Sequence, residues 1–563
     1  MWISRRELCS MALISVAVAA CGSDKKSTTT TAAPTTAAPT TSAAATTVAS
    51  ATTQKSTTPA TDGTTAVSSA TTDTAAPDTT NAPVATDTDP TAVLKYAWVS
   101  PTSLDPHKSS ISSDLYVLTT IYDRLIHQTP DVELVPGLAS KWEFSADGTS
   151  LNLTLRHDVT FQDGSKFDAS SVKANLERAK TLQGSSVKGD LAVITSVVVV
   201  DATTVQLMLG GPAASLPTIL SAQAGMMISP TGLADAALDQ NPSGAGMYKK
   251  SAFTPGSKLT LERWDGYWDP KAQLLGGVTI SFISDFPARL NALRSGDLDA
   301  ARLDPSQVDD AKGAGLTVLL QDSIEIGMLS LNRAKAPLDD VKVRQALNYA
   351  IDRKGIVDGL FHGLGTPSVQ VYSKGLPGYD PSLPADTYAY DVNKAKQMLS
   401  DAGHADGFAM EVNVAAIDFV VAYAEAIQAQ LGEIGVKVTV NQVALADYGK
   451  VVYTDVTGEG TAVIGAARAD ASQTATQFTP KAFTNPGGAS SPEVEDLYKQ
   501  SLDQKLSVSA RSDVLKKLGS TLVEQAFAVV IFHPQNPHAF NSKVVGYDNW
   551  RNVVELRGFG IKK

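Results

Sequence analysis

Few residues in this chain of 563 have the types and spacing that chemistry requires. It has no Gly-x-Ser-x-Gly nucleophile elbow, no His-Glu-x-x-His zinc motif and no Gly-x-x-x-x-Gly-Lys-Ser/Thr phosphate loop. His533 and His538 flank Pro534-Gln535-Asn536-Pro537, and neither a helix nor a strand brings positions with that separation onto one face. The carboxylates show no spacing that singles out a catalytic pair. We therefore predict no catalytic residue, no metal site and no cofactor.

Arg468, within the segment Gly465-Ala466-Ala467-Arg468-Ala469, could hold an anion. Its planar guanidinium presents N–H donors in a fork that matches the two oxygens of a carboxylate. An arginine can equally be a solvated surface residue, and the sequence leaves both interpretations open. We take Arg468 as a candidate anchor for a carboxylate or another anionic group.

The overall composition limits the class of protein. Hydrophobic residues make up 43% of the chain, and 47 Lys and Arg stand against 58 Asp and Glu, a formal charge of -11. That is enough apolar material for several cores. An acidic surface repels a polyanion, so we predict no nucleic-acid partner. With only two cysteines, Cys9 and Cys21, a disulfide-stapled scaffold is excluded.

The N-terminus predicts export. Arg5 and Arg6 precede the apolar run 8–20, which is too short to span a bilayer and is typical of a cleavable signal. The small residues before Cys21 resemble the lipobox of bacterial lipoproteins, in which the cysteine becomes the lipidated N-terminus. We therefore predict a signal peptide over 1–20 and lipidation of Cys21. A signal peptide cleaved without lipidation is the alternative.

Residues 21–91 follow as a segment rich in Thr, Ala, Ser and Pro. It contains no aromatic residue, so little in it could offset the entropy lost on ordering. We predict a disordered tether that holds a folded body away from a membrane surface.

Short apolar runs beyond the tether predict an antiparallel sheet. Residues 151–156 alternate with period two after the turn Asp147-Gly148, which indicates a strand behind a hairpin turn. The runs 197–200 and 204–209 flank a second turn. We therefore expect a mostly antiparallel sheet over 136–210, with one helix at 169–180.

Further along, the pattern becomes α/β. Apolar residues recur at helical spacing after Asp340, and we assign Asp340 and Arg344 to the cap or surface of this helix. A second helix begins at Asp391, and a longer one, about 419–434, leads through Gly435 into a strand pattern. Such units build sheets whose ligand crevices lie at strand ends, often between two lobes.

The order of several motifs resembles one family. Ser103-Leu104-Asp105-Pro106 looks like a Leu-Asp-Pro entry near a first strand, and Tyr122-Asp123-Arg124-Leu125 occupies the place of a Tyr-Glu-x-Leu. The motifs that follow in that family's order include 136–142, 161–164, 172–178, 246–248, 264–268, 298–300 and 337–347. On these motifs the chain resembles the family 5 solute-binding proteins of ABC importers, the extracellular dipeptide, oligopeptide and nickel-binding group.

This resemblance implies an α/β fold of the two-lobed periplasmic-binding-protein type (type II, cluster C) with an extra small antiparallel β-domain. By analogy, lobe I covers 92–135, 245–328 and 536–563. The β-domain covers 136–244, and lobe II covers 329–535. A solute would be enclosed where the two lobes meet.

The same analogy supplies candidate contacts. From lobe I we expect Trp98, Tyr116 and Arg302 to bind the solute, with core packing the alternative for Trp98 and solvated surface for Arg302. In lobe II, peptide-binding members carry Trp-x-x-Asp-x-x-Asp-Pro, whose second aspartate pairs with the peptide's α-amino group. Here Asp470 matches the first aspartate, but Gln473 replaces the second, and a neutral amide is a poor partner for an ammonium. We retain Arg468, Asp470 and Gln473 as ligand-binding candidates and expect no standard peptide ligand.

We therefore predict a membrane-tethered solute-binding component of an ABC importer, which encloses a peptide-like or other small organic molecule by hinge closure and is not an enzyme. We expect an extracytoplasmic monomer, lipid-anchored to the outer face of the cell membrane, with the importer's permease subunits as partners. The alternatives are an exported hydrolase and a ligand sensor built on the same fold.

Overall fold

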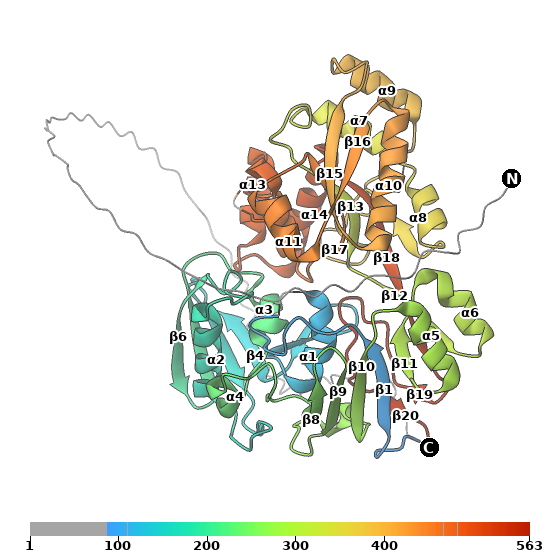
Figure 1. Ribbon diagram of the computed structural model, residues 1–563. Helices are drawn as coiled ribbons and strands as arrows, with labels where there is room; N and C mark the ends of the chain where they lie inside the picture. Colours follow the sequence, from blue (N-terminus) through green and yellow to red (C-terminus); the bar gives the residue numbers. More distant parts are fainter. Residues whose placement is uncertain (1–86, 110, 385, 466, 481) are drawn as a thin grey trace, which may run out of the picture. The chain divides into compact units, whose positions relative to one another are not determined.

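The computed structural model describes residues 87–563 except 110, 385, 466 and 481 (Figure 1). All of them belong to the compact unit Asp73–Lys563. The predicted signal peptide, the lipidation of Cys21 and nearly all of the tether lie outside the described residues. None of the helices in the described part is long and apolar enough to cross a membrane.

Lobe I is built on a sheet in which β1 lies parallel to β10 and β11. Its strands are β1 (Val93–Trp98), β8 (Tyr248–Thr254), β9 (Lys258–Arg263), β10 (Gly277–Phe282), β11 (Ala300–Arg302) and β12 (Thr317–Asp322). Because side chains alternate along a strand, Tyr96 and Trp98 pack with helix α1 (Leu115–Ile121) on one face, while Ala97 packs with α5 (Phe286–Ser295) and α6 (Val308–Gly313) on the other.

Lobe II has its own group of strands in the order β16-β15-β17-β13-β18, which shares β18 with the sheet of lobe I. Its strands are β13 (Ile326–Leu331), β15 (Ala409–Ala415), β16 (Lys437–Val443), β17 (Gly460–Gly465) and β18 (Ala528–Phe540), with β14 (Gly365–Pro367) paired to β18. Helices cover both faces of this sheet (Figure 1). On one side lie α7 (Val341–Tyr349), α8 (Arg353–Leu360), α9 (Val392–Asp401) and α10 (Asp418–Glu433). On the other lie α12 (Ala471–Ala475), α13 (Pro492–Ser501) and α14 (Val508–Glu524).

Two crossings connect the sheets of the two lobes. The chain leaves β12 and enters β13 through Ser323, Ile324 and Glu325. It returns inside β18, whose first residues pair with β13 and whose last residues pair with β11 and β12. Pro534, which lacks an N–H group, lies where β18 changes partners, since Pro534 pairs with β14 and Gln535 already pairs with β12.

The β-domain is a separate antiparallel sheet of β4 (Ala139–Phe144), β5 (Ser150–Leu155), β7 (Thr204–Leu209) and β6 (Ile194–Asp201). Helix α2 (Ala169–Thr181) packs on it, beginning at Asp168, whose carboxylate accepts from the N–H of Ser171. Gly148 in the first hairpin turn has φ +74°, which glycine adopts without strain. The predicted hairpins and helix of this region are confirmed.

The remaining α-helices and β-strands of the described chain are short. They are β2 (Ile126–Gln128), β3 (Leu134–Pro136), α3 (Leu216–Ile219), α4 (Pro230–Ala234), α11 (Leu445–Gly449), β19 (Val544–Val545) and β20 (Gly560–Ile561).

The helices predicted for the α/β half are also confirmed. Asp340 caps α7 and Asp391 caps α9, and α10 ends before Gly435, whose φ of +86° turns the chain into β16. The expectation for Arg344 is wrong. Its guanidinium is buried and donates to four backbone carbonyls, those of Ala526, Leu338, Asp339 and Gln525, so it fastens α7 to the end of α14.

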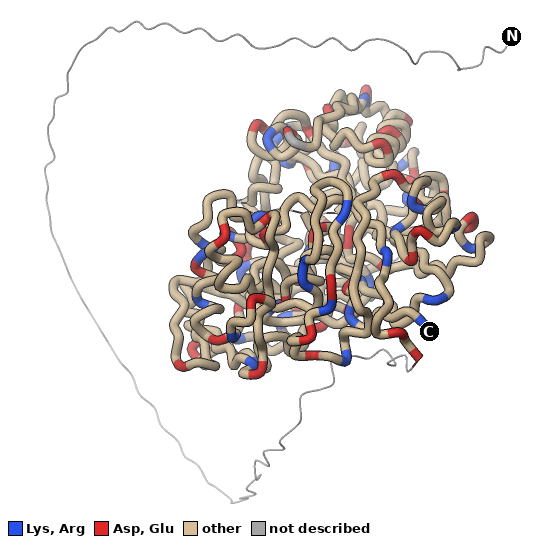
Figure 2. Tube along the Cα trace, turned by 60° about the horizontal axis from the view of Figure 1, so that its bottom comes forward, with Lys and Arg blue, Asp and Glu red and all other residues tan. Residues whose placement is uncertain are grey.

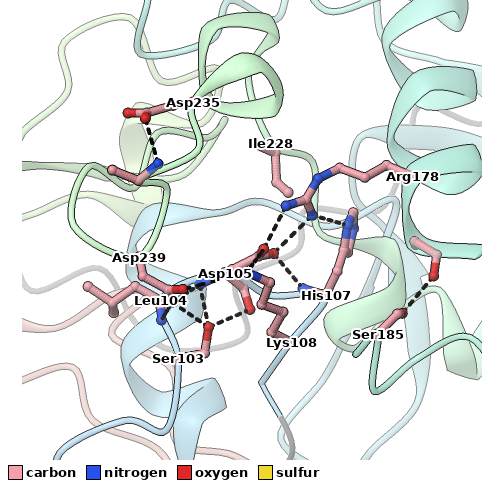
Figure 3. Close-up of polar contacts among 12 residues, drawn as sticks. Ser103, Leu104, Asp105, His107, Lys108, Arg178, Ser185, Ile228, Asp235 and Asp239 are labelled. Atoms are coloured by element: carbon pink, nitrogen blue, oxygen red, sulfur yellow. Dashed lines mark hydrogen bonds and ion pairs between the residues drawn. The ribbon is translucent and has the colours of Figure 1, made fainter. Parts of the chain in front are cut away.

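Asp105, from the motif that resembles Leu-Asp-Pro, ties lobe I to the β-domain (Figure 3). Arg178 of α2 donates from Nη1 to Asp105 Oδ1 at 3.1 Å and from Nη2 to Oδ2 at 2.6 Å. The same Nη1 lies 2.8 Å from His107 Nδ1. Because arginine carries no acceptor, His107 accepts through Nδ1 and its ring is neutral. This motif therefore has a structural role in joining two parts of the fold.

Basic and acidic residues are interspersed along the described trace rather than gathered by sign (Figure 2). Charge complementarity toward a small ligand therefore depends on single side chains at the site more than on a broad field.

Candidate functional site

Two adjoining cavities lie between elements of lobe I, the β-domain and lobe II. The larger has a volume of about 520 Å³ and the smaller about 70 Å³, and Ser112 and Ala467 line both. Clefts enclosed between lobes are the usual location of small-molecule sites. The larger cavity is lined by Ile111, Asp190, Ser215, Met328, Arg468, Gln473, Tyr498 and neighbouring residues. The smaller is lined by Trp98, Ser113, Tyr116, Arg302, Ser323, Ile324, Glu325, Gly465, Asn536, Asn552 and Val553, besides the shared pair.

Trp98 and Tyr116 form an aromatic wall of the smaller cavity. Their rings stack with centroids 3.8 Å apart and planes 20° apart. The indole N–H of Trp98, at the end of β1, donates to the carbonyl of Ser113 at 2.9 Å. Burial raises the pKa of the Tyr116 phenol, so it stays neutral. Both rings belong to the lobe I core and also line the cavity, so core packing and a place at the candidate site are compatible for Trp98.

Arg302, at the end of β11, lines the same cavity with part of its hydrogen-bonding capacity unused. Its Nη2 donates to Asn536 Oδ1 at 2.6 Å. Its Nε is buried and has no acceptor among the described residues. A buried N–H without a partner costs free energy, so this atom favours a ligand group or water that accepts from it.

The protein interior next to Arg302 carries a second positive charge, that of Arg289. Arg289 is 1% exposed, and its Nη1 donates to the carbonyl of Arg302 at 3.0 Å. Burial, reinforced by the charge of Arg302, lowers the pKa of Arg289 to about 10. Burial and the charges of both arginines lower the pKa of His538 to about 3, which keeps that ring neutral. Neither arginine has a carboxylate within ion-pair distance among the described residues, so the region favours an anion.

Glu325, in the crossing between β12 and β13, is a lining residue that sequence reasoning missed. Its side chain is partly exposed, and its carboxylate has no hydrogen bond or ion pair with the described residues. No motif or periodicity marks it, because it stands between two strands. Only the three-dimensional path of the chain brings Glu325 and Arg302 to one cavity.

Arg468 and Gln473 line the larger cavity. The backbone N–H of Arg468 donates to Thr474 Oγ1 at 2.9 Å, which fixes the loop, while its guanidinium is exposed. Asp190 of the β-domain lines the same cavity and was also missed. Although solvent reaches Asp190, the surrounding protein raises the pKa of its carboxyl, and the positive charge of Arg468 opposes this shift.

Asp470 does not line either cavity. It is 6% exposed, caps α12 through the N–H of Ser472, and accepts two hydrogen bonds from Arg511 of α14. The structure thus brings together Trp98, Tyr116 and Arg302 at one cavity and Arg468 and Gln473 at the other. It places Asp470 behind the wall that carries Gln473.

The two histidines considered for metal binding lie on β18, five positions apart. The ring nitrogens of His533 lie 2.9 Å and 3.0 Å from the backbone carbonyls of Glu325 and Gln370, and His538 lies parallel to Trp98 with centroids 6.3 Å apart. Within the described ranges, no group of three or more His, Cys, Asp and Glu residues is arranged to hold a metal ion.

Comparisons with known proteins agree with this geometry. The family model described as bacterial extracellular solute-binding proteins, family 5 Middle, matches residues 133–490. The glutathione-binding protein GsiB of Salmonella paratyphi A is 31% identical over 345 residues, which cover 60% of this chain and 66% of that protein. GsiB of Escherichia coli O1:K1 is 29% identical over 350 residues, 60% of this chain and 67% of its own. The match thus spans about two thirds of these relatives' length.

Solved structures share the fold. The binding protein AgaA of A. tumefaciens R10, in complex with agropinic acid, has a TM-score of 0.73 at 26% identity, over 84% of this chain and 99% of its own. DppA of Helicobacter pylori, in complex with the peptide STSA, has a TM-score of 0.73 at 23% identity, over 84% and 98%. The latter likeness concerns the fold alone. By its family match and its two-lobed α/β fold with an added β-domain, the chain belongs to family 5 of the bacterial extracellular solute-binding proteins.

Proposed function

We propose that this protein is the solute-binding component of an ABC importer, which encloses a small solute between lobes I and II and releases it chemically unchanged. The observation that carries the proposal is the pair of adjoining cavities whose walls come from both lobes and from the crossing between them. The proposed domain limits remain 92–135, 245–328 and 536–563 for lobe I, 136–244 for the β-domain and 329–535 for lobe II.

The connections between the lobes support a hinge mechanism. Among the described residues, only short segments at the end of β12 and inside β18 carry the chain from the strands of one lobe to those of the other. A solute that bonds to Arg302 of lobe I and Arg468 of lobe II at once would bind the closed arrangement better than an open one. It would therefore shift the population toward closure by the difference in binding free energy.

The chemistry of the walls supports a small organic solute with an anionic group. Arg302 and Arg468 offer guanidinium donors, Trp98 and Tyr116 offer an apolar surface, and Gln473 offers a neutral amide. Of two similar proteins, one is named as glutathione-binding and the other was solved in complex with agropinic acid. We propose a peptide-like or related carboxylate, with Asp470 acting indirectly by fixing the helix that carries Gln473.

Export and anchoring are part of the proposal. We propose a signal peptide over 1–20, lipidation of Cys21, and a tether through 91 that holds a monomeric binding body at the outer face of the cell membrane, where it meets the importer's permease subunits. Fractionation of cells that express Cys21→Ala should move the protein from the membrane to the soluble fraction. Persistent membrane association would count against acylation.

The test of solute binding is thermal unfolding of the whole exported chain across a panel of small carboxylates, dipeptides and amino acids. A ligand that binds only the folded state should raise the midpoint with its concentration, as RT ln(1 + [L]/Kd) requires. The bound compound should be recovered intact by mass spectrometry. Recovery of a reaction product would favour an exported hydrolase, and binding without any importer partner in pull-downs would favour a sensor.

A further inference from the structure

The smaller cavity holds one cation and one anion that do not pair with each other. Arg302 comes from β11 of lobe I, and Glu325 comes from the crossing between β12 and β13. An ion pair requires a nitrogen and an oxygen within 4 Å, and no such pair joins these two side chains in the described structure. Each therefore has bonding capacity that a third group can use.

Arg302 is suited to a carboxylate. Its Nε is buried without an acceptor, and its Nη2 is oriented by Asn536 Oδ1. Arg289 and the ring of His538 lie behind it, and neither brings a negative charge. A carboxylate on Arg302 would therefore satisfy an unused donor and reduce the repulsion between two guanidinium groups.

Glu325 is suited to an ammonium. Its partly exposed carboxylate makes no hydrogen bond to the described residues. Trp98 and Tyr116 line the same cavity, and aromatic rings attract cations. The position of Glu325 also accounts for Gln473, because a solute whose ammonium binds at the crossing needs no carboxylate at 473.

We infer that the smaller cavity is a binding site for a zwitterionic α-amino-acid head group, whose carboxylate pairs with Arg302 and whose ammonium pairs with Glu325. The rest of the solute extends past Ser112 and Ala467, which line both cavities, into the larger cavity beside Arg468. This inference rests on the proposed function and names the solute class of the same site. A γ-linked peptide with a free α-amino-acid head, or a long-chain amino acid, has this form.

The test compares each zwitterionic probe with analogues that lack one charge. One series is glutathione, glutaryl-cysteinylglycine without the head ammonium, and 4-aminobutyryl-cysteinylglycine without the head carboxylate. The other is norleucine, hexanoate and pentylamine. Calorimetric titration of the full exported chain should show at least one zwitterion bound, with each partial analogue about ten- to a hundredfold weaker, as expected for a lost charge-assisted hydrogen bond.

Variants assign each charge to its residue. Glu325→Gln should weaken the zwitterion about tenfold or more. It should not weaken the analogue without ammonium, for which only a repelling carboxylate is removed. Arg302→Lys should do the same with respect to the head carboxylate, since a lysine keeps the charge but not the fork. The exposed Glu133→Gln serves as the matched control and should change neither. Circular dichroism of each variant checks folding, and the analogue series on the unaltered protein stands without any variant.

Three results would overturn the inference. They are a partial analogue that binds as tightly as its zwitterion, a failure of both zwitterions to bind, and a co-purifying solute without an α-amino-acid group. A loss of stability in Arg302→Gln that disappears when Glu325→Gln is also present would show that the two side chains pair directly, which also contradicts the inference. If a different solute co-purifies and stabilises the protein, the proposed function stands and only the head group is wrong. If no solute co-purifies and no panel member stabilises, both fail.

Discussion

The guanidinium of Arg511 forms a bidentate ion pair with the carboxylate of Asp470, in which Nη1 donates to Oδ2 at 2.9 Å and Nη2 donates to Oδ1 at 2.8 Å. Asp470 begins α12 and Arg511 lies in the first turn of α14. Its Nε also donates to the carbonyl of Ser501, at the end of α13. Arg511 therefore joins three helices of lobe II, α12 through the ion pair and α13 through Nε, and through α12 it sets the place of Gln473 at the larger cavity.

Removing one partner of this pair should destabilise the fold. Asp470→Ala leaves the guanidinium of Arg511 without its anion in a largely buried place, a change that costs about 3 kcal/mol. Urea unfolding followed by circular dichroism measures the change. Asp513→Ala, on the same helix, removes an exposed partner of Lys516 and should cost at most about 1 kcal/mol.

This experiment also separates a positioning role from direct contact. If Asp470 bound the solute itself, Asp470→Asn would remove the ligand's partner and cut affinity as sharply as a change at Arg468. We expect instead a loss of stability with a smaller loss of affinity, since the amide keeps one acceptor for the N–H of Ser472.

The sequence predicts much of the fold because its signals are local. The strand of residues 151–156 and the helix that Asp340 caps follow from alternation, helical spacing and capping within a few positions. The family motifs, such as Asp105, proved to join parts of the fold, as their bonds to Arg178 show. Local patterns therefore identify the family more readily than the solute.

The site could be predicted only in part, because its members meet through chain crossings. Trp98 and Arg302 end neighbouring strands and could be proposed on that ground. Glu325 and Asp190 lie in connections without a pattern, and nothing local indicates that they face a cavity. The prediction for Arg344 is wrong for a related reason. A charged residue on a helix is predicted to lie at the surface, and only the folded structure shows the carbonyl groups that this buried guanidinium binds.

Arg344 should not tolerate replacement by lysine. Its donors reach four carbonyls on both sides of the α7–α14 contact, and a lysine ammonium has three donors at a single point. We expect Arg344→Lys to lower the free energy of unfolding by about 2 to 3 kcal/mol, since buried carbonyls would lose their partners. Lys342→Arg, on an exposed position of the same helix, should stay within about 0.5 kcal/mol. An unaffected Arg344→Lys would mean that water replaces the guanidinium.

Stability should fall as the pH decreases from about 6.5 to about 4. Burial lowers the pKa of His107 from 6.5 to about 4. The negative charge of Asp105 opposes this shift, and the positive charge of Arg178 adds to it. Between pH 6.5 and pH 4 the unfolded chain binds a proton at this residue that the folded chain does not bind. The free energy of unfolding is therefore highest above pH 6.5 and decreases as the pH falls through this range. This single group contributes roughly 3 kcal/mol across the window, from its shift at about 1.4 kcal/mol per unit.

His107→Gln tests that origin. The glutamine oxygen can accept from Arg178 as Nδ1 does, but the residue cannot titrate. Urea unfolding between pH 7 and pH 4 should therefore show a slope of stability with pH that is smaller by up to one proton. The exposed His157→Gln should keep the slope of the unaltered protein. Equal slopes for both variants would mean that His107 is charged in the folded state.

Arg468 should decide affinity for an anionic tail while leaving the fold intact. Its guanidinium is exposed in the larger cavity, and only its backbone is bonded, to Thr474. We expect Arg468→Ala to weaken a solute that carries a second carboxylate by about tenfold or more, through the loss of a charge-assisted hydrogen bond. The unfolding midpoint without ligand should change little, because the replacement removes no hydrogen bond of the side chain and only the electrostatic interaction with Asp190. Arg294→Ala, an exposed arginine on α5 away from both cavities, is the control and should keep full affinity.

Asp190 lines the same cavity as Arg468, so Asp190→Asn should increase the affinity for the anionic solute. Opposite effects of Arg468→Ala and Asp190→Asn on affinity would place the anionic tail between these two residues. If neither variant alters affinity in calorimetric titration, the anion lies elsewhere and the larger cavity receives a neutral part of the solute.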